Sequence, residues 1–194
     1  MKKILGFLGH EVFLGTLIAL LSVFTALASY QGSMSDSDQN KYEILAMKNL
    51  NDGNAEYLRA NQDITQDYNY FDNWYLNVDE RPAIGEYYQN SFSEALQAAV
   101  DRDPNLVWDD QYYSEMYTDA TNLWDESDTN FALASEADAK GDKLALVMMI
   151  MALGLAFAAW AALLGADSNL RLAFALFGLI MFVGGLVIYL PIVL

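Results

Sequence analysis

Apolar residues follow two different patterns along this chain. Two stretches near the C-terminus, 144–164 and 172–190, are almost wholly apolar and contain no Asp, Glu, Lys, Arg or His. A bilayer core about 30 Å thick needs about 20 such residues in helical form. The pattern therefore predicts two transmembrane helices, and the short segment 165–171 makes them an antiparallel pair.

A third apolar run extends from Phe13 to Ala28 and allows two interpretations. The small-x-small sequence 26–28, preceded by an N-terminal lysine pair, is typical of a cleaved signal peptide. His10 and Glu11 directly precede the run, however, whereas a signal peptide normally carries only positive charge there. We therefore expect this segment to be retained as a first transmembrane helix.

The segment between the first two apolar runs has a helical period. Its first half carries an apolar stripe in which residues recur every three or four positions, and its second half carries another that leads directly into residues 144–164. Two such stripes favour an antiparallel, coiled-coil-like helical hairpin. We expect its tip at 77–108, a single short helix over 83–100, a hinge at 31–40, and a second arm that continues unbroken from about 109 into the membrane. The stripe residues are Tyr42, Ala46, Leu50, Gly53, Tyr57, Ala60, Ile64, Tyr68, Phe71 and Tyr75, then Tyr113, Met116, Ala120, Trp124, Ser127, Phe131, Ala134, Ala137, Gly141 and Ala145.

The predicted fold class is an all-α membrane protein with three transmembrane helices and a long antiparallel helical-hairpin insert, outside the membrane, between the first two. We expect three parts: 1–30 with the first span, 31–142 as an acidic helical hairpin domain, and 143–194 with the other two spans. Lysines near the N-terminus favour a cytoplasmic N-terminus and an extracytoplasmic acidic domain, in the plasma membrane of a prokaryote.

Charge is concentrated in the middle part of the chain. The whole chain has a net charge of −16, and residues 31–142 carry 24 of its 26 acidic and six of its ten basic side chains. Such a surface repels phosphates, which argues against nucleic acid as a partner. The absence of Cys excludes disulfides, zinc–thiolate sites and thiol nucleophiles. We expect no cofactor.

The sequence offers little that is typical of an enzyme or a metal site. Asp101, Asp103, Asn105 and Asp109 match four positions of a calcium-binding loop, but Leu106 replaces its turn glycine and Tyr112 its bidentate glutamate. The alternative is a turn that caps the following helix. No carboxylate pair stands out as acid and base, so we expect neither a catalytic site nor a bound metal.

Two groups of residues are candidates for protein–protein contacts. A two-helix hairpin has little interior, so aromatic residues at its tip are expected to contact another chain, although a small local core is the simpler alternative. These are Trp74, Tyr75, Tyr87, Tyr88, Trp108, Tyr112 and Tyr113. Small residues in the spans allow close helix packing, within the chain or between copies; they are Ala152, Ala156, Ala158, Ala162, Gly178, Gly184 and Gly185.

The layout resembles an uncharacterised family of bacterial and archaeal membrane proteins with one N-terminal span, an acidic helical insert and two C-terminal spans. The resemblance is carried by LASYQGS at 27–33, AEYLRANQ at 55–62 and the segment 134–160. It implies the architecture and no activity.

These observations predict a non-enzymatic integral membrane subunit or scaffold that assembles, through its hairpin and spans, with itself or with a larger membrane complex. Its partners would be the lipid bilayer and other protein chains. The alternative is a homo-oligomeric pore or sensor, in which polar residues of the first span line a path and the acidic insert concentrates cations. Those polar residues are Thr16, Ser22, Thr25 and Ser29.

Overall fold

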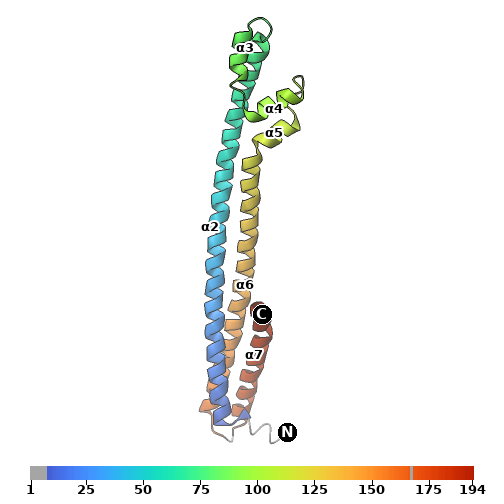
Figure 1. Ribbon diagram of the computed structural model, residues 1–194. Coiled ribbons are helices and arrows are strands. Elements are labelled where there is room, and N and C mark those ends of the chain that lie inside the picture. Colours follow the sequence, from blue (N-terminus) through green and yellow to red (C-terminus); the bar gives the residue numbers. More distant parts are fainter. Residues whose placement is uncertain (1–7, 167) are drawn as a thin grey trace. The chain divides into compact units, whose positions relative to one another are not determined.

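The protein is all-helical in the part that the computed structural model describes, residues 8–166 and 168–194. Six helices and no strand are present there (Figure 1): α2 (Glu11–Asn77), α3 (Pro82–Gln89), α4 (Glu94–Arg102), α5 (Asp110–Met116), α6 (Thr118–Leu163) and α7 (Asn169–Val193). The predicted helical class is therefore confirmed for these residues. Three of the helices, α2, α6 and α7, contain a stretch long and apolar enough to cross a membrane, which agrees with the three apolar runs in the sequence.

The chain divides into two compact units. Unit 1 comprises residues 1–42 and 132–194, and unit 2 comprises residues 43–131. The long helices α2 and α6 contribute to both units, while α7 belongs to unit 1 and α3, α4 and α5 belong to unit 2.

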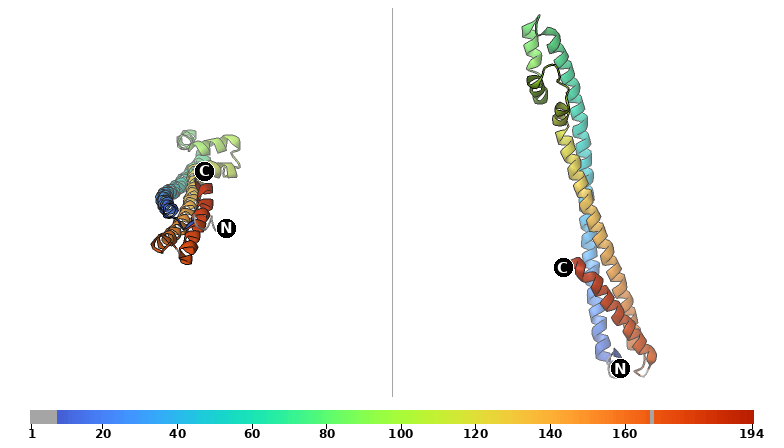
Figure 2. Two further views of the ribbon diagram at one scale, coloured as in Figure 1. Left: turned by 90° about the horizontal axis from the view of Figure 1, so that it is seen from below. Right: turned by 90° about the vertical axis from the view of Figure 1, so that its right-hand side faces the viewer.

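Unit 1 is a bundle of three helices, in which the first part of α2, the last part of α6 and all of α7 lie side by side (Figure 2). Phe24 of α2 packs edge-on against Phe182 and Tyr189 of α7, with ring centroids 5.8 and 5.7 Å apart. The buried core includes Leu17, Leu21, Ala28, Leu144, Val147 and Met151. Because these residues recur every three or four positions, each helix turns one face inward.

Small residues bring α2 and α6 close together where the apolar part of unit 1 gives way to polar sequence. A Cβ at Gly141 would lie 2.9 Å from a carboxylate oxygen of Asp36, and one at Gly32 would lie 3.7 Å from the Leu144 side chain. The backbone stays helical throughout 31–40. The predicted hinge is therefore wrong, because the Gly and Ser residues of this segment serve helix packing instead.

Within unit 2, α2 and α6 pack against each other as antiparallel helices. The Ser127 hydroxyl donates to the Ala46 carbonyl (2.9 Å), and farther along α2 a Cβ at Gly53 would meet the Trp124 ring at 2.7 Å. Tyr117, which immediately precedes α6, donates to Asn61 (2.9 Å). Along these contacts, residue numbers rise on α2 and fall on the segment 117–127, which is the order of an antiparallel pair. The absence of a side chain at Gly53 leaves room for the indole ring of Trp124.

The rest of unit 2 forms a small aromatic core between α2, α4 and α5. Ile64, Leu96, Ala99, Val107 and Tyr112 are buried in it. The single helix predicted over 83–100 is wrong, because Ser93 is extended (φ −62°, ψ 161°) and separates α3 from α4. Its hydroxyl accepts from the Leu96 N–H and caps α4. The predicted second arm is likewise interrupted at Tyr117, between α5 and α6.

Candidate functional site

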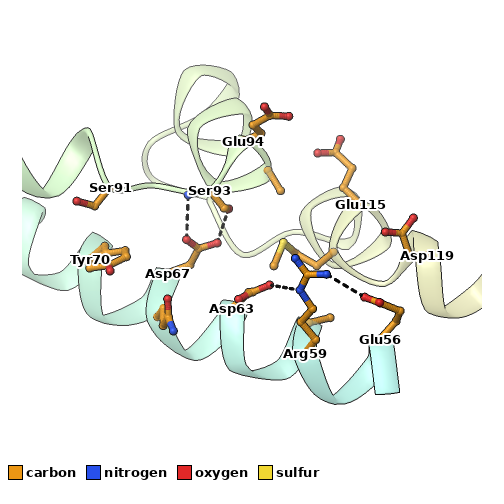
Figure 3. A pocket seen from close by; sticks show the side chains of 14 residues that line it. Glu56, Arg59, Asp63, Asp67, Tyr70, Ser91, Ser93, Glu94, Glu115 and Asp119 are labelled. Atoms are coloured by element: carbon orange, nitrogen blue, oxygen red, sulfur yellow. Dashed lines mark hydrogen bonds and ion pairs between the residues drawn. The ribbon is translucent and has the colours of Figure 1, made fainter. Parts of the chain in front are cut away.

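A groove of about 560 Å³ in unit 2 is lined mainly by acidic side chains (Figure 3). One wall is a stretch of α2, and the others are the segment 91–95 and the residues around the junction of α5 and α6. Its carboxylates come from all three walls and are Glu56, Asp63, Asp67, Glu94, Glu115 and Asp119; Arg59 is the one basic side chain in the lining. Six carboxylates and one guanidinium leave the groove strongly negative.

Arg59 neutralises only the α2 wall. Its guanidinium lies 3.5 Å from Glu56 and 4.0 Å from Asp63, its neighbours on the same helix face. Within the described part of the chain, no ion pair involves Glu94, Glu115 or Asp119 on the opposite side (Figure 3). The attraction of a cation to one carboxylate 4 Å away amounts to about 1 kcal/mol in bulk water and about 4 kcal/mol near a protein surface. Several carboxylates without an ion-pair partner in one groove therefore favour a cationic ligand.

Asp67 is the one deeply buried carboxylate of the groove, with 2% of its surface exposed. It accepts hydrogen bonds from the Ser93 N–H (3.1 Å), the Ser93 hydroxyl (2.5 Å) and the Tyr112 hydroxyl (2.9 Å). A buried carboxylate is tolerated only when its oxygens are satisfied in this way. Asp67 thus connects α2 to the start of α4 and to α5, and it fixes the distance between the groove walls.

Tyrosine hydroxyls next to Asp67 are held in their protonated form. Burial, together with the neighbouring Asp67 carboxylate, raises the pKa of Tyr112 far above its ordinary value of 10. A hydrogen bond between the hydroxyls of Tyr68 and Tyr113, 2.5 Å apart, raises the pKa of Tyr113 to about 12. Below about pH 10 the Tyr112 hydroxyl is therefore protonated and donates to Asp67, and the Tyr113 hydroxyl is protonated in its hydrogen bond with Tyr68.

The aromatic residues predicted at an interface fall into two groups. Trp74, Trp108 and Tyr113 are half-buried against the core of unit 2, and Tyr112 is completely buried within it rather than exposed. Tyr88 is also half-buried. Tyr75 and Tyr87, in contrast, keep 66% and 68% of their surfaces exposed. The local core accounts for the first group, and only Tyr75 and Tyr87 present most of their rings outward.

The residues of the calcium-loop candidate have other bonding partners. Asp109 accepts the N–H of Tyr112 (2.8 Å) at the start of α5 and forms a two-pronged contact with Arg102 at 2.8–3.0 Å. The hydrogen bond from the Tyr112 N–H contributes most, followed by the contact with Arg102, and together they hold the pKa of Asp109 below its usual value. Asp103 accepts from the Asn105 N–H, and Asp101 from Gln97. No cluster of three or more potential metal ligands occurs among the described residues.

The small residues of the spans are also divided. A Cβ at Gly178 would lie 3.3 Å from Ala158, which is fully buried, and one at Gly185 would meet Met151 at 2.6 Å. A Cβ at Gly184 would meet nothing within 4 Å, and Ala152, Ala156 and Ala162 are exposed. Gly154, which the sequence analysis missed, lies where α6 contacts both other helices: its added Cβ would lie about 3 Å from Leu21 of α2 and Met181 of α7.

Sequence reasoning also missed the groove itself, although Asp67 carried a usable signal. It follows Ile64 by three residues and precedes Phe71 by four, so an acidic residue lies on the face of α2 that the period marks as apolar. Ser93 and Arg59 carried no comparable signal, because their roles depend on which segments fold against α2.

Comparison of the chain with protein-family models, with curated proteins and with solved structures finds no match.

Proposed function

We propose that this protein is a non-enzymatic, membrane-anchored scaffold, whose acidic groove in unit 2 receives a basic segment of another protein. The observation that carries the proposal is the groove, in which six carboxylates face a single arginine. The resemblance to a membrane-protein family with an acidic helical insert agrees with the proposed architecture and carries no information on this role.

Membrane anchoring is supported by the composition of the three long helices. Each has an 18-residue window with a mean hydropathy of 2.2 or more, and at most a third of the residues in each window are buried within the chain. Helices that remain apolar on their outer faces are typical of proteins surrounded by lipid. We propose that the first of them is retained rather than cleaved, because Ala28, at the suspected cleavage site, is fully buried in the core of unit 1.

A partner with positive charge is favoured over a second copy of this chain. Unit 2 carries 19 acidic and four basic side chains, so two copies of this surface repel each other. Larger assemblies would then form through the spans or through the exposed Tyr75 and Tyr87. We propose an extracytoplasmic hairpin for the insert and a larger membrane complex as its setting.

The pore alternative has less support. The hydroxyls of Thr16, Ser22 and Thr25 each donate to a carbonyl four residues earlier in α2, at 2.7–2.8 Å. Groups bonded to their own helix offer less to a permeating ion than free ones do.

The experiment that tests this function compares two variants with the same change in charge. Glu94→Gln/Glu115→Gln/Asp119→Asn removes the three groove carboxylates opposite the α2 wall, and Glu80→Gln/Glu86→Gln/Asp72→Asn removes three exposed carboxylates outside the groove lining. The probe is a fluorescent lysine-rich peptide, whose binding to the purified full-length protein is followed by anisotropy.

We expect the groove variant to bind this peptide roughly tenfold more weakly, since three exposed charge pairs contribute a few tenths to 1 kcal/mol each. The control variant should retain most of the affinity. Equal losses in both variants would mean that the peptide responds only to net charge, and the proposed role of the groove would be abandoned.

A further inference from the structure

A second groove, of about 500 Å³, lies in unit 1 between α6 and the end of α7. Its α6 side is lined by Glu136, Lys140 and Lys143, and its α7 side by Val187, Ile188 and Ile192. One wall is thus charged and the other apolar. Such a combination fits an amphiphile better than it fits a peptide or a small ion.

The charged residues follow a definite order along α6. Glu136, Lys140 and Lys143 are four and three residues apart, so they share one helix face. Residues 144–164, which contain no charged side chain, begin directly after Lys143. Along α6 toward residues 144–164, the groove therefore presents the carboxylate of Glu136, then the ammonium groups of Lys140 and Lys143, and then apolar surface.

These three side chains are available to a ligand. Within the described part of the chain, no ion pair joins Glu136 to either lysine or joins any of the three to another residue. Lys140 and Lys143 are exposed, and so is 66% of Val187 across the groove. The lysine pair is unusual in a chain with a net charge of −16.

We propose that this groove binds a phospholipid with an ethanolamine headgroup. Lys140 and Lys143 hold the phosphate, Glu136 accepts hydrogen bonds from the ammonium group, and an acyl chain lies along Val187 and Ile188. The inference rests on the proposed membrane anchoring, which would place this end of the apolar stretch at the bilayer surface.

The spacing and the chemistry both select this headgroup. Glu136 and Lys140 are one turn apart, about 6 Å along the helix axis, which is comparable to the length of an ethanolamine phosphate. A choline headgroup has no N–H to donate to Glu136, and a glycerol headgroup has no positive charge for it. A free ethanolamine phosphate would leave the apolar wall in contact with water.

The test is native mass spectrometry of the delipidated full-length protein in detergent, titrated with phosphatidylethanolamine, phosphatidylcholine and phosphatidylglycerol of identical acyl chains. We expect the ethanolamine lipid to bind roughly fivefold more tightly than the other two, as one additional ion pair allows. Similar binding of all three lipids would overturn the proposal.

Variants distinguish the roles of the two charges. Lys140→Gln/Lys143→Gln should weaken the binding of all three lipids. Glu136→Gln should remove the preference for the ethanolamine lipid and strengthen the binding of the glycerol lipid. The matched control, Lys41→Gln/Lys48→Gln, changes two exposed lysines outside the groove lining and should leave lipid binding unchanged. Circular dichroism of each variant verifies that the helices are intact. Loss of binding in the control, or an unchanged preference in Glu136→Gln, would contradict the assignment.

Alkaline extraction of membranes containing the wild-type protein separates this inference from the function on which it rests. Protein that stays in the pellet but lacks the ethanolamine preference would overturn the lipid site alone. Protein released into the supernatant would overturn the membrane anchor and the lipid site together.

Discussion

Asp67 determines how the walls of the acidic groove are held together. It is almost fully buried, and its oxygens accept hydrogen bonds from Ser93 and Tyr112, which lie on two other segments of unit 2. Removing a donor from a buried acceptor costs the free energy of desolvating that acceptor in addition to the hydrogen bond itself. The Tyr112 hydroxyl should therefore contribute measurably to the stability of the fold.

Tyr112→Phe should therefore destabilise the protein by about 1–3 kcal/mol, since it removes one of the three hydrogen bonds that the buried Asp67 accepts and leaves its Oδ2 with the Ser93 hydroxyl as donor. Chemical denaturation of the purified protein, monitored by its intrinsic tryptophan fluorescence, measures this change in the free energy of unfolding. Tyr75→Phe is the control, because that ring is exposed in the described structure, and it should change stability by less than about 0.5 kcal/mol. A Tyr112→Phe variant as stable as the control would show that the buried contact contributes nothing.

The apolar runs and the periodicity of α2, α6 and α7 could be predicted from sequence, because three-to-four-residue spacing is a local property. Their lengths could not be predicted, since α2 continues through 31–40 and α6 begins only at Thr118. The division between α3 and α4 could not be predicted, because the extended Ser93 that begins α4 donates its N–H and hydroxyl to Asp67 of α2, a contact between distant parts of the chain. Similarly, the choice of Gly154 over Ala152 or Ala156 as a packing residue depends on which face of α6 meets α7.

Helix packing in unit 1 predicts different responses at two glycines of α7. A Cβ at Gly178 would lie 3.2 Å from the Gly154 carbonyl oxygen, whereas one at Gly184 would meet no atom within 4 Å. Gly178→Leu should therefore lower thermal stability in detergent, by roughly 1–3 kcal/mol for an overpacked core. Gly184→Leu should leave it nearly unchanged. Equal tolerance at both positions would contradict the observed packing of α6 on α7.

The whole molecule combines apolar helices with a strongly acidic unit, and both features could be predicted from the distribution of apolar and charged residues along the chain. The concentration of carboxylates in one groove could not be predicted from the sequence, because it depends on how the segments 91–95 and 115–119 fold against α2. The proposed topology places unit 2 outside the cytoplasm and the segment between α6 and α7 inside it.

This topology can be tested with single cysteines, because the natural chain has none. In intact cells, a membrane-impermeant maleimide should label Ser114→Cys in unit 2 and should not label Gly165→Cys between α6 and α7. Both positions are exposed, so both should react once the membrane is permeabilised. The opposite pattern in intact cells would reverse the proposed orientation.

Native mass spectrometry of the protein extracted gently from its own membranes tests the proposed scaffold role most directly. We expect a complex that contains a second, basic polypeptide, together with this chain at an intact mass that includes residues 1–28. The partner should be lost from the groove variant Glu94→Gln/Glu115→Gln/Asp119→Asn and kept by the control Glu80→Gln/Glu86→Gln/Asp72→Asn. A partner that remains on the groove variant, or a wild-type protein that carries no other polypeptide, would contradict it.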